Sequence, residues 1–252
     1  MKEWITGRNP VYEVLRTIRR QVFRLWIVRR VQQQGRINDI LSLSKREKVP
    51  VEWVERKQLD KIADNHQGVA LQVDGYPYAA FQDVLQRAQE RNEPLFVLLL
   101  DLIQDPQNFG TLLRTAEAVG VHGVVMPGRR AARITPAVVN ASSGACEHLL
   151  VLQANISQTI SALKKEGVWI IGLEGSSDAQ SIEKMDLSGP LGVVVGSEGE
   201  GMRELVRRSC DVLVQLPMRG KIESLNAAVA GSVVLYSAYL ARYQSVEESR
   251  NL

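Results

Sequence analysis

The sequence LPMRGKIESLN occupies residues 216–226 and runs directly into the uncharged segment 227–241. The apolar run 212–216 has the composition of a β-strand, and the uncharged segment has the length and apolar content of a buried helix. We predict Ser224 as the N-cap of that helix, because a serine side chain accepts hydrogen bonds from the unpaired amides of a first turn. A loop of this kind offers its backbone groups to a ligand.

Two upstream segments share this arrangement. DLIQDPQNFG, at residues 101–110, follows the apolar run 95–100 and leads to Arg114. GSEGEG, at residues 196–201, follows the apolar run 191–195. Polar residues therefore follow three predicted strands, and we expect the three loops to form one site.

The chain from residue 95 onward alternates predicted strands with segments of helical period. Several strands are apolar on both faces, which is typical of a parallel sheet covered by helices. The predicted fold class is therefore α/β. A Gly-x-Gly-x-x-Gly motif after the first strand and a P-loop are both missing, which argues against an NAD-type dehydrogenase. The predicted strands are Leu95 to Leu100, Gly123 to Met126, Leu149 to Leu152, Trp169 to Leu173, Leu191 to Val195 and Val212 to Leu216.

The first 75 residues predict a separate small α/β domain. Helical and strand-like pieces alternate, with strands at 22–28, 51–54 and 69–73. A polar segment with helical composition, Phe81 to Arg91, then leads to Pro94. We therefore predict one domain over residues 1–75, a linker over 76–93 and a second domain over 94–252.

The two predicted domains differ in charge. Residues 1–75 hold 15 Lys/Arg against 9 Asp/Glu, net +6, whereas residues 94–252 hold 14 against 16, net −2. Eight of the basic residues fall within the first 30 positions. Such a run forms either a solvated helix face or a surface for RNA phosphates.

Cysteine spacing and the N-terminus exclude several classes of protein. Cys146 and Cys210 lie far apart without partners at metal-ligand spacing, so we expect buried structural thiols and no metal site. The N-terminus lacks an apolar secretion signal, which predicts a cytoplasmic location. Segment 224–241 is long enough to span a membrane, but its polar residues favour a helix in the core or at a subunit interface.

The three loops resemble, in order and spacing, the motifs of the SpoU (TrmH) family of S-adenosylmethionine-dependent RNA 2'-O-ribose methyltransferases. The similarity spans residues 94–242, and GRNPVYEVL at 7–15 is similar to the start of members with an added RNA-binding domain. The resemblance implies a homodimer whose SPOUT-type parallel-sheet domain forms a trefoil knot and follows an L30e-like domain. One departure is visible: Ala227-Ala228 stands where the family often has Val-Ser, and we expect altered helix packing rather than lost chemistry.

The resemblance also implies roles for individual residues. Arg114 is the principal catalytic residue, and around it lie Asn108, Glu198, Ser224 and Asn226. S-adenosyl-L-methionine is the cofactor, and its binding residues are Gly172, Leu173, Glu174, Gly196, Leu216, Met218, Leu225 and Asn226. The predicted RNA-binding residues are Arg8, Arg16, Arg19, Arg20 and Arg114.

Arg114 permits more than one interpretation. Asn108 and Arg114 stand six positions apart across a predicted strand-to-helix turn, so we expect them to converge near one substrate group. A guanidinium group keeps its proton in proteins, which favours electrostatic stabilisation over a general-base role. Without its neighbours, Arg114 would be a solvated helix residue or a partner of Glu117. His66 is either an RNA contact or a loop cap.

The resemblance favours a guanosine of 23S rRNA as the substrate, because the tRNA-methylating relatives generally lack the N-terminal domain. A tRNA 2'-O-methyltransferase and a resistance-type enzyme acting on a 23S adenosine remain alternatives. An alternative of another class is a non-catalytic RNA-binding or ribosome-assembly protein. The intact set of polar motif residues argues against it.

Overall fold

The computed structural model describes residues 2–128, 132–222 and 224–250, with side chains up to residue 242. The chain divides into two compact units. Unit 1 comprises residues 1–77 together with 133–148, and unit 2 comprises residues 78–132 together with 149–252. The segment 133–148 therefore belongs with the N-terminal residues, although its sequence neighbours lie in unit 2.

Unit 1 is a four-stranded sheet of order β1-β4-β2-β3. The strands predicted at 22–28, 51–54 and 69–73 are confirmed, whereas the short strand β1 was missed. β1 pairs antiparallel with β4, and β2 runs parallel to β3. The elements are β1 (Glu3–Thr6), α1 (Arg8–Thr17), β2 (Val22–Val28), α2 (Arg36–Arg46), β3 (Val51–Val54), α3 (Arg56–Asp60), β4 (Val69–Val73), α6 (Pro136–Ala141) and η1 (Ala145–His148).

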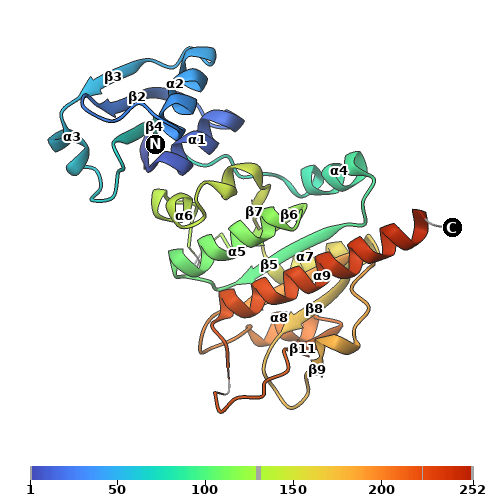
Figure 1. Cartoon of the computed structure of the whole chain (residues 1–252). Helices are drawn as coiled ribbons and strands as arrows, with labels where there is room; N and C mark the ends of the chain where they lie inside the picture. Colours follow the sequence, from blue (N-terminus) through green and yellow to red (C-terminus); the bar gives the residue numbers. More distant parts are fainter. Residues whose placement is uncertain (1, 129–131, 223, 251–252) are drawn as a thin grey trace. The chain divides into compact units, whose positions relative to one another are not determined.

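Unit 2 contains a seven-stranded parallel sheet of order β7-β6-β5-β10-β8-β11-β9 (Figure 1). The α/β class and the parallel sheet are confirmed, and only the two-residue strand β9 was missed. The strands are β5 (Phe96–Asp101), β6 (Gly123–Met126), β7 (Val151–Gln153), β8 (Trp169–Leu173), β9 (Gln180–Ser181), β10 (Leu191–Gly196) and β11 (Val212–Gln215). The helices are α4 (Phe81–Arg91), α5 (Pro106–Ala118), α7 (Ile156–Lys165), η2 (Ile182–Lys184), α8 (Glu204–Ser209) and α9 (Ala227–Arg250).

Helices cover the sheet because its central strands are apolar on both faces. Every residue of β5 and β10 is buried. One core cluster joins Val97 and Leu99 of β5 to apolar side chains of α4, α7 and α8. α9 packs against α5 and β10.

The linker predicted at 76–93 contains a helix that is part of the core of unit 2. Val84 and Ala88 of α4 are buried in the cluster that β5 shares with α7 and α8. None of the helices in the described part of the chain has the length and apolar content to cross a membrane. The trefoil knot implied by the resemblance stays a prediction.

Candidate active site

A cavity lies at one edge of the sheet of unit 2. Strands β5, β10, β8 and β11 are neighbours and parallel, so their carboxyl ends meet at the same edge. The loops after β8, β10 and β11 and the first turn of α9 line a cavity of about 470 Å³ there. Two of the three motif loops therefore converge on one cavity, together with the loop after β8.

Most residues predicted to bind the cofactor line this cavity. They are Leu173, Glu174, Gly196, Leu216, Met218, Leu225 and Asn226. Gly172 is an exception, because it lies within β8 and is not part of the lining. Ser224 and Glu198, predicted as catalytic residues, also line the cavity. The structure describes every residue of the stretch 216–226 except Glu223.

The glycine-rich loop after β10 folds into a tight turn. The backbone amides of Ser197 and Gly201 donate to each other's carbonyl oxygens at 3.0 and 3.1 Å. The turn passes so close to Gly196 that a Cβ atom there would lie 2.3 Å from the carbonyl carbon of Gly201. Gly196 therefore has to be glycine for the turn to close, and this closure presents Glu198 beside the cavity.

Asn226 links the three motif loops. Its Nδ2 amide donates to Asn108 Oδ1 at 3.0 Å and also to Glu198 Oε1. Its Oδ1 atom accepts from the backbone amides of Ala228 and Val229 at 2.9 and 3.1 Å. Asn226 therefore caps α9, and the predicted N-cap at Ser224 is wrong because the helix begins at Ala227.

Arg114 lies further along the same helix as Asn108. α5 begins at Pro106, where the Asp105 side chain accepts from the amide of Asn108, so Asn108 and Arg114 share one helix. Six helical residues separate two side chains by about 9 Å along the axis and about 120° around it. The predicted strand-to-helix turn between them is therefore wrong, and their convergence on one substrate group stays a prediction. Arg114 is exposed and is not part of the cavity lining.

Two charged pairs beside the cavity were not predicted. Asp101, fully buried at the end of β5, accepts from the backbone amide and Nε of Arg203, both at 2.8 Å. This pair fixes the end of the glycine-rich turn. Glu174 accepts from Arg207 Nε at 3.0 and 3.1 Å, so a cavity carboxylate is held by α8. A carboxylate directly after an apolar strand was the sequence signal for Asp101.

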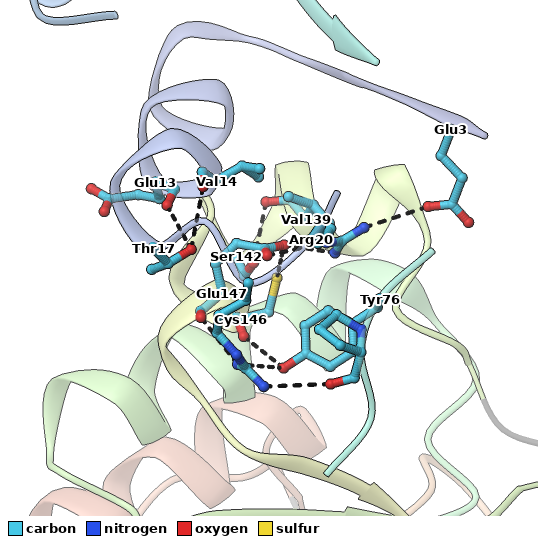
Figure 2. A network of polar contacts seen from close by, with 12 residues as sticks. Glu3, Glu13, Val14, Thr17, Arg20, Tyr76, Val139, Ser142, Cys146 and Glu147 are labelled. Atoms are coloured by element: carbon cyan, nitrogen blue, oxygen red, sulfur yellow. Dashed lines mark hydrogen bonds and ion pairs between the residues drawn. The ribbon is translucent and has the colours of Figure 1, made fainter. Parts of the chain in front are cut away.

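The five arginines predicted to bind RNA have different surroundings. Arg20 is a correction: its side chain is fully buried and pairs with the equally buried Glu147 at 2.6 Å (Figure 2). Arg19 is partly buried, and its guanidinium donates to the carbonyl oxygens of Glu147 and Pro77. Arg16 is exposed, and Arg8 is half-buried. A basic sequence run therefore contains both structural and surface arginines.

The cysteines and metal-ligand residues add little chemistry to the site. Cys146 is buried, and burial raises the pKa of the Cys210 thiol to about 12, which disfavours a thiolate. Among the described residues, no three His, Cys, Asp or Glu side chains group as metal ligands.

Two family models match the sequence. The model of the SpoU rRNA Methylase family matches residues 95–236. The chain belongs to the SpoU family. A second model, described as RNA 2'-O ribose methyltransferase substrate binding, matches residues 4–79. This SpoU protein is therefore an RNA methyltransferase with a substrate-binding region at its N-terminus.

Similar proteins cover nearly the whole SpoU chain. YacO of Bacillus subtilis (strain 168), a candidate TrmH-family tRNA/rRNA methyltransferase, is 40% identical over 242 residues, 95% of this chain and 96% of YacO. The SpoU methyltransferase AviRb from Streptomyces viridochromogenes, solved with AdoMet, aligns with a TM-score of 0.80 at 21% identity, covering 96% and 91% of the two chains. The AdoMet-bound rRNA methyltransferase from Sinorhizobium meliloti aligns with a TM-score of 0.76 at 23% identity, covering 94% and 86%. The two structures share the fold of this chain.

Proposed function

We propose that this SpoU methyltransferase transfers the methyl group of S-adenosylmethionine to the ribose 2'-hydroxyl of a guanosine in 23S rRNA. It acts as a homodimer in the cytoplasm. The observation that carries the proposal is the link that Asn226 makes between Asn108 and Glu198 beside a cavity of cofactor size.

The cavity fits the chemical groups of S-adenosylmethionine. Its volume of about 470 Å³ lies within the range of small-molecule sites. The carboxylate of Glu174 is an acceptor for hydroxyl or ammonium groups, and Leu173, Leu216 and Leu225 offer apolar surface to an adenine. AviRb and the Sinorhizobium enzyme, which share the fold, were both solved with this cofactor.

The bound cofactor supplies an electrophilic methyl group, and the protein's task is to position the acceptor. Asn108, Glu198 and Asn226 hold three loops in one arrangement and so fix the wall of the cavity. Positioning of this kind contributes several kcal/mol to a displacement reaction. Arg114 binds an RNA phosphate and stabilises the alkoxide that develops at the ribose oxygen. The proton passes to water or to an RNA phosphate.

The outer face of α9 supports the homodimer. One face of the helix is fully buried, at Val234, Leu235 and Ala238. The opposite face is apolar but at least 43% exposed, at Val229, Val233, Tyr236 and Leu240. Their spacing places these four side chains on one stripe, and an exposed apolar stripe of this kind marks a protein interface. A second copy of the chain covers it in our proposal.

Unit 1 supports RNA as the substrate. The substrate-binding model matches residues 4–79, and residues 1–75 carry the net positive charge of the chain. Positive charge attracts RNA phosphates irrespective of sequence. The family resemblance alone assigns the RNA as 23S rRNA and the base as guanosine.

Methyl transfer from labelled S-adenosylmethionine tests this function. The substrates are 23S rRNA, 16S rRNA and tRNA from cells that lack the gene, and the products are digested to nucleosides. We expect label in 2'-O-methylguanosine from 23S rRNA and none with an Asn226→Ala variant as control. Label in 2'-O-methyladenosine would favour the resistance-type alternative, and label in tRNA the tRNA alternative. Absence of label from every RNA would favour the non-catalytic alternative.

A further inference from the structure

Unit 1 holds a second cavity, of about 540 Å³, far richer in positive charge than the first. We call it the arginine pocket and define it by Arg8, Arg30, Arg56, His66, Gln67 and Gly68, which line it. Among the residues that the structure describes, its lining contains three arginines and no carboxylate. Such a cavity selects an anionic ligand.

Strand topology gathers two of these arginines. β2 and β3 are parallel, so their carboxyl ends lie at the same edge of the sheet of unit 1. Arg30 follows β2 and Arg56 opens α3 directly after β3. Both side chains are exposed. The pocket therefore receives one cation from the segment after β2 and one from the segment after β3.

The third arginine is held in place by the loop before β4. The backbone amide of Arg8 donates to Gln67 Oε1 at 2.9 Å, and Arg8 Nε donates to the carbonyl oxygen of Gln67 at 3.2 Å. Arg8 is also the first residue of α1, whose first turn contains no acidic side chain. The amino end of a helix favours anions, so the backbone adds to the charge of Arg8.

A buried histidine shapes the same loop. His66 is 2% exposed, and its Nδ1 atom accepts from the amide of Gly68 at 2.9 Å. Nδ1 therefore carries no proton, and Nε2 donates to Asp60 at 3.0 Å. Gly68 adopts φ +85°, and a Cβ atom there would lie 2.9 Å from Val31. His66 is thus a loop cap that supports the pocket from within rather than a ligand-binding surface residue.

We propose that the arginine pocket holds one unpaired nucleotide of the RNA substrate. Arg8, Arg30 and Arg56 bind its phosphate, and Val28 and Val31, which also line the cavity, contact the base together with the guanidinium planes. Asp60 approaches Arg56 at 3.7 Å and offsets part of its charge, which leaves Arg8 and Arg30 as the main phosphate ligands. A hollow of about 540 Å³ has room for a base that leaves the stack, whereas duplex RNA is bound across its grooves and phosphates. The proposal rests on the proposed function for the identity of the RNA.

Two double variants with equal charge change test the pocket. Arg30→Ala/Arg56→Ala removes two lining cations. Arg29→Ala/Lys57→Ala removes two cations at the adjacent positions, which are exposed and outside the lining. Affinity for protein-free 23S rRNA is measured over a range of salt concentrations. Cofactor affinity is measured by calorimetry on the same samples, because all four positions lie in unit 1.

We expect the pocket variant to lose about tenfold or more in RNA affinity and the control variant less than about threefold. The slope of log affinity against log salt becomes shallower by about 0.7 in the pocket variant, because contact with one phosphate of single-stranded RNA is lost. Cofactor affinity stays unchanged in both. Equal losses in the two variants would overturn the pocket, because affinity would then follow total charge.

Cross-linking adds a second readout. The wild-type protein is bound to RNA that carries 4-thiouridine, and the complex is irradiated. Cross-linked peptides are then identified by mass spectrometry. We expect cross-links within residues 28–31 or 66–68, and an excess of unpaired oligoribonucleotide should remove them while an excess of duplex RNA should not. Cross-links elsewhere only, or equal competition by duplex, would overturn the proposal. A wild-type protein that shows these cross-links but transfers no methyl group would leave the pocket standing and refute the proposed function.

Discussion

The Nδ2 amide of Asn226 donates to Asn108 Oδ1 at 3.0 Å across 118 positions of sequence. The same amide donates to Glu198 Oε1, and the carbonyl end of the side chain caps α9. One side chain therefore joins the first, second and third motif loops and starts the helix that carries the exposed apolar stripe. Changes at Asn226 should separate its role in the helix from its role in the site.

Asn226→Asp should keep the helix cap but lose methyl transfer. An aspartate still accepts from the amides of the first turn, so stability should exceed that of Asn226→Ala by about 1 kcal/mol. Its carboxylate cannot donate to Glu198 and repels it. Adding Glu198→Gln supplies an amide that can donate to the new carboxylate at position 226, and this should restore part of the activity. An Asp variant as active as wild type would show that the link is dispensable.

Arg114→Ala should abolish methyl transfer and leave the affinity for S-adenosylmethionine nearly unchanged, since Arg114 lies outside the cavity lining. Arg114→Lys keeps a point charge without the planar fork and should retain some activity with an unchanged pH profile. Methyl-transfer rates measured from pH 6 to pH 9 distinguish the electrostatic role of Arg114 from a general-base role. A Lys variant as active as wild type, whose rate follows a new ionisation near neutral pH, would instead support a general base.

Arg20→Met should destabilise the protein by about 3–5 kcal/mol, because it leaves the buried Glu147 without its bidentate partner. The double variant Arg20→Met/Glu147→Leu removes both charges and should recover most of the loss. Urea unfolding measures both free energies. An Arg20 variant of wild-type stability with weakened RNA binding would return Arg20 to the RNA-binding set.

Removing residues 1–75 should leave a cofactor-binding protein with greatly weakened activity on rRNA, because these residues carry the net +6 charge. The deletion also removes Arg20 from Glu147, so segment 133–148 loses its partners in unit 1. Calorimetry and rRNA binding against salt are compared with the full chain. A truncated protein with unchanged RNA affinity and salt slope would show that unit 1 does not bind the substrate.

Stability should fall as the pH drops below about 6.5 because of His122. Burial lowers the pKa of His122 from its ordinary value of 6.5, and its Nδ1 atom accepts from the amide of Phe96 at 3.0 Å. As the pH falls through about 6.5, the imidazole of His122 becomes protonated in the unfolded chain but stays neutral in the folded chain. The free energy of unfolding therefore decreases with falling pH. His122→Gln should flatten the free energy of unfolding between pH 7 and pH 5. An unchanged slope would assign the effect to other groups.

The strands could be predicted because each buried strand is a local apolar run bounded by turn residues. β9 has only two residues, both polar, and β1 has only two apolar residues among its four. The cavity loops were predicted from their positions after strands, together with the family resemblance. The burial of Arg20 could not be predicted, because its partner lies 127 positions away and a buried arginine has the same local sequence as an exposed one. A turn between Asn108 and Arg114 was predicted because the capping role of Asp105 was not recognised. Asp105 caps α5, so the helix already begins at Pro106 and contains both residues.

The most direct test of the central claim is a map of 2'-O-methyl groups in the rRNA and tRNA of cells with the gene, without it, and without it but carrying the Asn226→Ala variant. Our account predicts one guanosine of 23S rRNA that loses its 2'-O-methyl group on deletion and regains it only with the wild-type gene. An unchanged map, or restoration by the variant as complete as that by the wild type, would contradict the account.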